Sequence, residues 1–165
     1  MSDWGNNIAM SVDGILRNPN DSAPIMSGVL LYYSLVKSHR VTLIFDTAAR
    51  DKVQHWLRIN NMTEHAGEIY WELEDPEDIV ERREKQLGKI RAQGSLSLMV
   101  ESDPSVAEML LVKGIPTLLY LHPSYMRPEH RPDYEEEITP WGSLLDEVKR
   151  QRTMRSMDTR LNDQF

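Results

Sequence analysis

The sequence predicts an α/β fold, a three-layer αβα sandwich in which helices cover both faces of a mainly parallel sheet. Short apolar stretches rich in β-branched residues alternate along the chain with amphipathic stretches of helical periodicity. The apolar stretches are followed by acidic or hydroxyl residues, which are typical of turns and helix starts. Because an order of strand, helix and strand implies parallel pairing with right-handed crossovers, this alternation predicts the sandwich.

The first predicted strand is a buried stretch that leads into a tight turn. Ile8, Met10 and Val12 alternate with smaller residues, which indicates that part of this strand faces a core. The pair Asp13-Gly14 then ends it with residues typical of turns. Strands are predicted over residues 7–12, 41–45, 67–73, 96–100 and 115–121. The second of these is rich in apolar and β-branched residues, so we expect it in the middle of the sheet.

The predicted helices begin at capping residues or prolines. Asp103 is a cap with Pro104 at the first helical position, and Gly114 ends that helix. Asp46 or Thr47 is expected to cap the helix that follows the second strand. Helices are predicted over residues 25–38, 48–59, 76–92, 104–113 and 144–154.

Length and composition favour one globular domain. A chain of 165 residues with 40% apolar residues can bury a sizeable core. The net charge of -7 disfavours a nucleic-acid-binding surface, so we expect no nucleic-acid partner. No apolar stretch approaches the ~18 residues that span a bilayer, and the first residues lack the features of a signal peptide, so we expect no membrane partner. The chain has no Cys, which fits a reducing compartment, and we expect it to be cytoplasmic.

The end of the first strand carries the most informative motif, Ser11-Val12-Asp13-Gly14-Ile15-Leu16. Residues two apart on a strand share a face, so Ser11 and Asp13 are expected to point the same way. The motif resembles the Asp-x-Asp-Gly-Thr-Leu opening of the haloacid dehalogenase-like (HAD-like) phosphohydrolases. Ser11 stands in place of the first Asp, and Ile15 in place of the Thr.

A second stretch strengthens this resemblance. Residues 98–109, followed by Gly114-Ile115-Pro116-Thr117, are similar to the family's order of strand, acidic residues, helix and Gly-Ile-x-Thr. The resemblance covers roughly residues 7–120. It implies a Rossmannoid sandwich without an inserted cap domain.

The resemblance implies catalytic roles for Ser11, Asp13 and Thr47. In the family an Asp attacks the phosphoryl group, a second Asp is the general acid, and a Thr or Ser binds the transferred oxygens. Ser11 has no carboxylate with which to form an acyl phosphate, and a hydroxyl needs an adjacent base. The residues alone suggest other roles: Ser11 hydrogen-bonds locally, Asp13 is a turn residue, and Thr47 or Asp46 caps a helix.

The resemblance also implies a Mg²⁺ site formed by Asp13, Glu101 and Asp103, because carboxylate oxygens suit this ion. With Ser11 in place of a ligand, we expect the binding of Mg²⁺ to be weak or absent. Asp103 is also well placed to cap the following helix, and we favour that role over metal binding. The family's Lys has no clear counterpart, and the basic residues of the nearest predicted helix are loose substitutes: Arg82, Arg83, Lys85 and Lys89.

We predict a single HAD-like domain over residues 1–150, followed by a polar tail over 151–165. Residues 122–140 are Pro-rich and acidic and are predicted to form a long surface loop. Because long loops are often functional, this loop and the tail are candidates for docking onto an unknown protein partner or a second copy of the chain.

Two functions fit these observations. Without the nucleophilic Asp, the Lys and the Thr, the domain is expected to be a catalytically impaired pseudo-phosphatase that acts as a binding or structural module. The alternative is a Mg²⁺-dependent phosphatase acting on a small phosphorylated substrate, because Asp13, Glu101 and Asp103 are retained. A response-regulator receiver domain has a similar acidic stretch, but there the stretch opens the chain, whereas here it follows two predicted strands.

Overall fold

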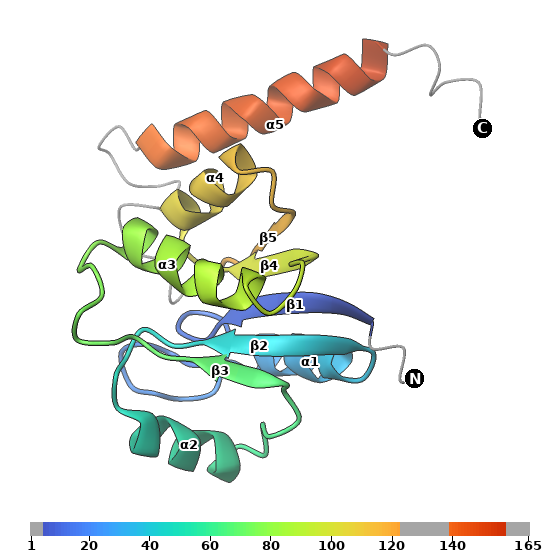
Figure 1. Cartoon of the computed structure of the whole chain (residues 1–165). Coiled ribbons are helices and arrows are strands. Elements are labelled where there is room, and N and C mark those ends of the chain that lie inside the picture. Colours follow the sequence, from blue (N-terminus) through green and yellow to red (C-terminus); the bar gives the residue numbers. More distant parts are fainter. Residues whose placement is uncertain (1–4, 123–138, 158–165) are drawn as a thin grey trace. The chain divides into compact units, whose positions relative to one another are not determined.

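The computed structural model describes residues 5–122 and 139–157. The first part contains five strands: β1 (Gly5–Ser11), β2 (His39–Ile44), β3 (Gly67–Ile69), β4 (Leu98–Glu101) and β5 (Thr117–Leu119). They form one sheet in the order β3-β2-β1-β4-β5, and every neighbouring pair is parallel (Figure 1). The mainly parallel sheet expected from the sequence is confirmed.

The central strand is β1, and β2, which we expected in the middle of the sheet, lies directly beside it. Ile8 lies opposite Val41 of β2 on one side and opposite Leu98 of β4 on the other. Ala9 and Met10 are completely buried. Residues 8–11 of this strand are buried, because they have a neighbouring strand on each side and a helix layer on each face, whereas Asn6 at its start is exposed.

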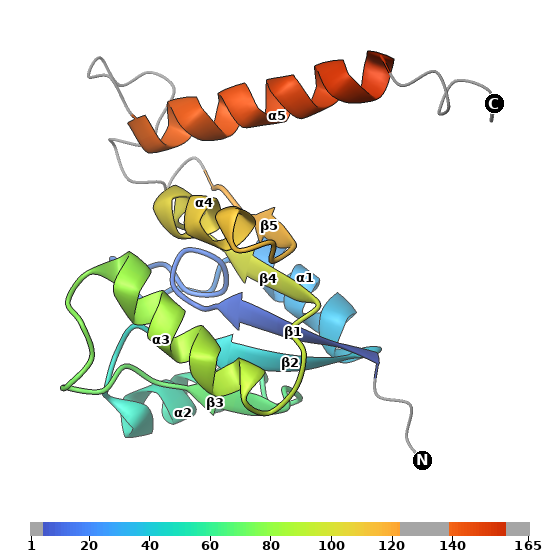
Figure 2. The same ribbon diagram turned by 45° about the horizontal axis from the view of Figure 1, so that its top comes forward.

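The helices form the two outer layers of the sandwich. α1 (Met26–Val36) and α2 (Arg50–Ile59) cover one face of the sheet, and α3 (Ile79–Arg91) and α4 (Pro104–Val112) cover the other (Figures 1 and 2). Because side chains alternate along a strand, Ile8 and Met10 belong to the core under α1 and α2, whereas Ala9 belongs to the core under α3 and α4. The predicted three-layer architecture is confirmed.

Along the chain, β2 and β3 extend the sheet on one side of β1, and β4 and β5 extend it on the other side. β1, β2 and β3 lie side by side, and α3 then leads across to β4 on the other side of β1. The connections that follow β1 and β4 therefore diverge, and ligands of such folds bind in the crevice outside the strand ends. Ser11 ends β1 and Glu101 ends β4, so both lie at this edge, as expected.

Several helices and strands begin or end at other residues than the sequence predicts. α3 begins at Ile79 rather than Pro76 because the side chain of Asp78 accepts hydrogen bonds from the N–H groups of Val80 and Glu81. β3 is also shorter than predicted and ends at Ile69.

The chain divides into two compact units, Met1–Met126 and Arg127–Phe165, which we describe separately. In the second unit, α5 (Thr139–Met157) is longer than the predicted helix 144–154, and the boundary predicted at residue 150 falls inside it. Of the predicted loop 122–140, residues 123–138 lie outside the described residues, as do residues 158–165 of the predicted tail. None of the described helices is long and apolar enough to cross a membrane.

Candidate functional site

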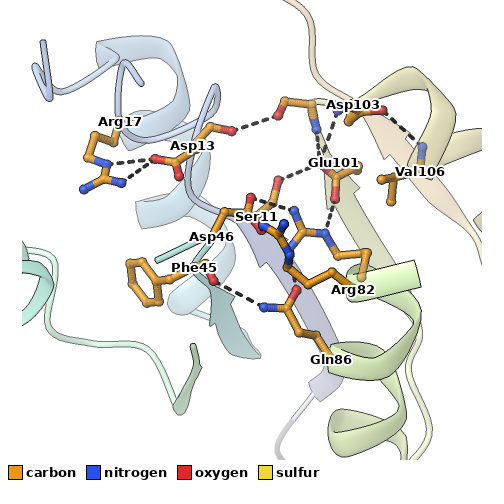
Figure 3. Close-up of polar contacts among 12 residues, drawn as sticks. Ser11, Asp13, Arg17, Phe45, Asp46, Arg82, Gln86, Glu101, Asp103 and Val106 are labelled. Carbon is orange, nitrogen blue, oxygen red and sulfur yellow. Dashed lines mark hydrogen bonds and ion pairs between the residues drawn. The ribbon is translucent and has the colours of Figure 1, made fainter. Parts of the chain in front are cut away.

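Buried polar side chains gather where the sheet's central strands end (Figure 3). We call them the Arg83 cluster, and its members are Ser11, Asp46, Arg83, Gln86 and Glu101. Four of the five side chains are essentially inaccessible to water, and Asp46 is half-buried. Burying polar groups costs free energy unless they are paired, so the partners of each group decide what this site can do.

Arg83 is the centre of the cluster. Its guanidinium donates from Nε to Glu101 Oε2 at 2.9 Å, from Nη2 to Asp46 Oδ2 at 2.9 Å, and from Nη1 to Gln86 Oε1 at 2.8 Å. Burial alone lowers the pKa of Arg83, but the two carboxylates outweigh it and raise this pKa above its ordinary value. The site therefore holds a permanently charged cation between two carboxylates.

Helical periodicity places Arg83 inside the protein. Arg83, Leu87 and Ile90 share one face of α3, and all three are buried. The amide of Gln86, one turn along, donates from Nε2 to the carbonyl of Phe45 at 3.2 Å, which joins α3 to the end of β2. Arg83 thus occupies an apolar position of an amphipathic helix.

Glu101 is completely hydrogen-bonded. Its Oε1 accepts from Ser11 Oγ at 3.0 Å and from the N–H groups of Ser102 at 2.8 Å and Asp103 at 3.2 Å, and its Oε2 accepts from Arg83. Burial raises the pKa of Glu101, and the charge of Arg83 opposes this shift. Because an ionised carboxylate has about four acceptor positions, Glu101 has none left for another partner.

Ser11, which the resemblance of the sequence motif compares with a nucleophile, is directed into the cluster. It follows Ala9 by two residues on β1, so its side chain faces α3, and it is completely buried. Its hydroxyl donates to Glu101 Oε1. The oxygen that would attack a phosphoryl group is therefore shielded from any substrate in solution.

Asp13 lies at the same edge with a different partner. Its Oδ1 accepts from Arg17 Nε at 2.8 Å and lies 2.7 Å from Arg17 Nη2. Burial raises the pKa of Asp13, and Arg17 opposes the shift. Ser11 and Asp13, which we expected to point the same way, thus bind different groups.

The turn after β1 packs tightly against the end of β4. Ser102 Oγ donates to the carbonyl of Asp13 at 2.8 Å. Gly14 has a φ of 82°, and a Cβ there would lie 2.8 Å from Ser102 Oγ. Both the left-handed backbone and the close approach require glycine at this position.

The end of β2 contributes Asp46 to the cluster, whereas Thr47 has a local role. Thr47 Oγ1 accepts from Ala49 N at 3.2 Å, just before α2. Asp46 Oδ2 binds Arg83, and its Oδ1 is buried without a hydrogen-bond partner. Of the two residues considered from the sequence, the structure therefore brings Asp46 to the site and leaves Thr47 beside it.

The residues expected to bind Mg²⁺ do not form one group. Asp103 caps α4: its Oδ1 accepts from Ser105 N and from Val106 N, and the second of these bonds is drawn in Figure 3. Asp13 binds Arg17, and Glu101 binds Arg83. Within residues 5–122 and 139–157, no three His, Cys, Asp or Glu side chains lie close enough to hold a metal ion. The donor set does not fit Mg²⁺, because the Arg83 guanidinium already lies between Glu101 and Asp46.

Sequence reasoning left Arg83 as one of several loose substitutes and missed Gln86 entirely. A signal for Arg83 was present: its spacing from Leu87 and Ile90 matches the apolar face of the helix. Gln86 has the same spacing, one turn after Arg83 and one turn before Ile90, and it is buried with them. Its partner, the carbonyl of Phe45, is 41 residues away in the chain, so the contact itself could not be predicted.

Comparisons with known proteins support the fold. No protein-family model matches the chain, and no curated protein matches it. Two solved structures of a Pnkp1/Rnl/Hen1 complex, one described as an RNA repair complex, contain chains that are 13% identical to this one, with TM-scores of 0.62 and 0.61. The match covers 74% of this chain and 48% or 44% of theirs, so this chain spans about half their length. At this identity the likeness shows the α/β fold alone.

These structures correct one expectation. We expected no nucleic-acid partner from the net charge of -7. That prediction is wrong as an exclusion, because chains of similar fold occur in an RNA repair complex. A net charge summed over the chain describes solubility and long-range steering, and a local binding surface can differ from it.

Proposed function

We propose that this chain is a catalytically impaired HAD-like domain, a pseudo-phosphatase that acts as a binding or structural module. The observation that carries the proposal is the buried Arg83–Glu101 pair, with Ser11 hydrogen-bonded to it. This network fills the place in which the family's nucleophile and metal ion would act. A cytoplasmic location, expected from the absence of Cys, remains part of the proposal.

The order of the motifs supports the family resemblance. The Asp13-Gly14 turn follows the central strand, and Glu101 ends the neighbouring strand β4. The stretch Gly114-Ile115-Pro116-Thr117 leads into β5, at the position of the family's Gly-Ile-x-Thr. Arg83 is the best candidate for the family's basic residue because, unlike Lys85, it points into the site.

The chemistry of the cluster supports impaired catalysis. A serine nucleophile requires a base that can take its proton. Glu101 is the neighbour of Ser11, but Arg83 and two backbone N–H groups already bind its oxygens, which weakens it as a base. The hydroxyl is also too deeply buried to meet a substrate.

One observation favours the alternative, a Mg²⁺-dependent phosphatase. Burial raises the pKa of Asp13, and a carboxyl group that holds its proton more strongly suits a general acid. Against it stands the donor set, which does not fit Mg²⁺.

The test is phosphate release from an aryl phosphate in Mg²⁺, with Asp13→Ala as the matched control. A phosphorylated oligoribonucleotide serves as a second substrate, because chains of similar fold occur in an RNA repair complex. We expect the wild type and Asp13→Ala to release phosphate at the same background rate on both substrates. Mg²⁺-dependent release by the wild type that disappears in Asp13→Ala would establish the alternative.

A further inference from the structure

Two carboxylates approach the same point from different strands of the sheet. Glu101 ends β4, and Asp46 follows β2, and the negative charge of Asp46 contributes to the raised pKa of Glu101. Like charges in a buried site repel each other, and leaving them without a cation is strongly destabilising. The cation between them here is a side chain of the same molecule.

Arg83 meets the demands of this position. Its Nε and Nη2 reach the two carboxylates at 2.9 Å each, and the guanidinium stays charged at every pH at which the protein folds. Mg²⁺ would demand about six oxygen ligands at about 2.0–2.1 Å. Glu101 and Asp46 cannot approach an ion that closely while the guanidinium lies between them.

Arg83 is also held in place from behind. Its side chain is 1% exposed, and its Nη1 donates to Gln86 on the same helix. Leu87, one turn further along α3, packs into the core between this helix and the sheet. Arg83 therefore leaves the carboxylates only if α3 itself moves away from the sheet.

We propose that Arg83 is the resident cation of this site and replaces a divalent metal ion between Glu101 and Asp46. The wild-type protein then binds neither Mg²⁺ nor Mn²⁺ here, and removal of the Arg83 charge turns the two carboxylates into a divalent-cation site. Only the word "replaces" rests on the proposed function, because it assumes that HAD-like domains hold a metal ion at this place. The evidence for Arg83 as the cation is the local geometry.

The central variant is Arg83→Gln, which removes the charge and keeps a polar side chain. The double variant Arg83→Gln, Glu101→Gln removes one carboxylate as well. The matched control is Arg82→Gln, at the next position of α3, where the guanidinium donates to the carbonyls of Pro76 and Glu77 and lies 3.9 Å from Asp46. Each protein is titrated with MnCl₂ and MgCl₂ by calorimetry and is melted in chelator and in millimolar Mn²⁺.

We expect no binding heat and the same Tm in chelator and Mn²⁺ for the wild type and for Arg82→Gln. Arg83→Gln should have a lower Tm in chelator, because it leaves two buried carboxylates without a cation. Saturating Mn²⁺ should raise that Tm by at least about 3 °C. The double variant should lose this response.

Two outcomes would overturn the proposal. One is an Arg83→Gln protein that folds without responding to either ion, and the other is a wild type that binds Mn²⁺ and loses this binding when the single change Glu101→Gln, made as a further control, is introduced. The wild-type measurement requires no variant to fold. If Arg83→Gln folds only when it is refolded with Mn²⁺, the proposal stands. If Arg83→Gln does not fold in the presence of Mn²⁺ and does not fold in the presence of Mg²⁺, the result counts against the proposal. Phosphate release is not a readout here, so an active enzyme that binds no metal would refute the proposed function alone.

Discussion

Ser11 shows how the surroundings of a residue decide its chemistry. A strand-end serine facing a crevice could in principle attack a substrate, but this one is completely buried and donates to Glu101. Glu101 in turn is shared with Arg83. The hydroxyl of Ser11 therefore serves as one donor in a closed network.

Substitutions of Ser11 should therefore change stability. Ser11→Ala removes one of several hydrogen bonds to Glu101, so we expect a loss of about 1 to 2 kcal/mol in the free energy of unfolding. Ser11→Asp places a second negative charge against Glu101 and should be more damaging. Urea unfolding measures both.

The pH dependence separates this explanation from simple overpacking. Repulsion raises the pKa of the carboxyl pair in the folded state of Ser11→Asp, so the protein should regain stability as the pH falls and one group takes up a proton. Ser11→Asp should therefore unfold at a higher urea concentration at about pH 5 than at about pH 7. If it is as stable as the wild type at neutral pH, the two carboxylates are not in contact.

Glu68 predicts a second pH effect, away from the site. Burial raises the pKa of Glu68, but hydrogen bonds from Tyr70 and His65 together outweigh it and lower the pKa below the ordinary value of 4.5. A lowered carboxyl pKa stabilises the fold above the unfolded-state value, and this stabilisation is lost as the pH falls through the folded-state value. The Tm of Glu68→Gln should lie below that of the wild type at neutral pH, and the two should converge as the pH falls below 4.5.

His65→Gln is the control for this interpretation. His65 Nε2 lies 2.8 Å from Glu68 Oε1, and its Nδ1 lies 3.2 Å from Tyr32 Oη on α1. Glu68→Gln should lower the Tm at neutral pH by less in the His65→Gln background than in the wild-type background, because one partner of the carboxylate is already gone. A Tm difference in the wild-type background that is independent of pH would contradict the ionic role of Glu68.

At the scale of elements, the position of α1 depends on a close approach to the turn after β1. A Cβ on Gly28 would lie 1.7 Å from the carbonyl oxygen of Ile15, well inside van der Waals contact. Ile15 is completely buried, as is Leu16 beside it. The turn that carries Asp13 is thus pressed against α1, and this contact sets where the turn lies relative to the sheet.

Two glycine-to-alanine changes test this contact. Gly28→Ala forces α1 away from the turn, and we expect it to lose at least about 3 kcal/mol of the free energy of unfolding. Gly88→Ala is the matched control, because Gly88 also lies within a helix, α3, and a Cβ there meets no atom within 4 Å. Its better helix propensity should stabilise the protein by up to about 1 kcal/mol.

Urea unfolding of the two variants measures the difference. Because the intrinsic gain from Gly to Ala in a helix is similar at both positions, the gap between them reports the approach of α1 to the turn. Equal stabilities for Gly28→Ala and Gly88→Ala would show that α1 does not pack against Ile15 in solution.

At the scale of the whole first unit, the strand order decides where chemistry can occur. The reversal after β3 places β1 between β2 and β4, and the residues that follow these three strands meet at one edge. Ser11, Asp46 and Glu101 come together only for this reason. The crevice position is common in this kind of sheet, and here the side chain of Arg83 fills it.

The sequence by itself determined the fold class, the buried character of β1 and the cap of α4. Each depends on local information: apolar periodicity marks strands and helices, and the side chain of Asp103 bonds N–H groups only two and three residues away. Only the tertiary structure decided the partners within the Arg83 cluster. Arg83 pairs with Glu101 across 18 residues and with Asp46 across 37, and no local pattern carries such pairings. The choice between Asp46 and Thr47 likewise depended on tertiary structure, because Asp46 bonds Arg83 37 residues away, whereas Thr47 bonds only Ala49 N, two residues along the loop after β2.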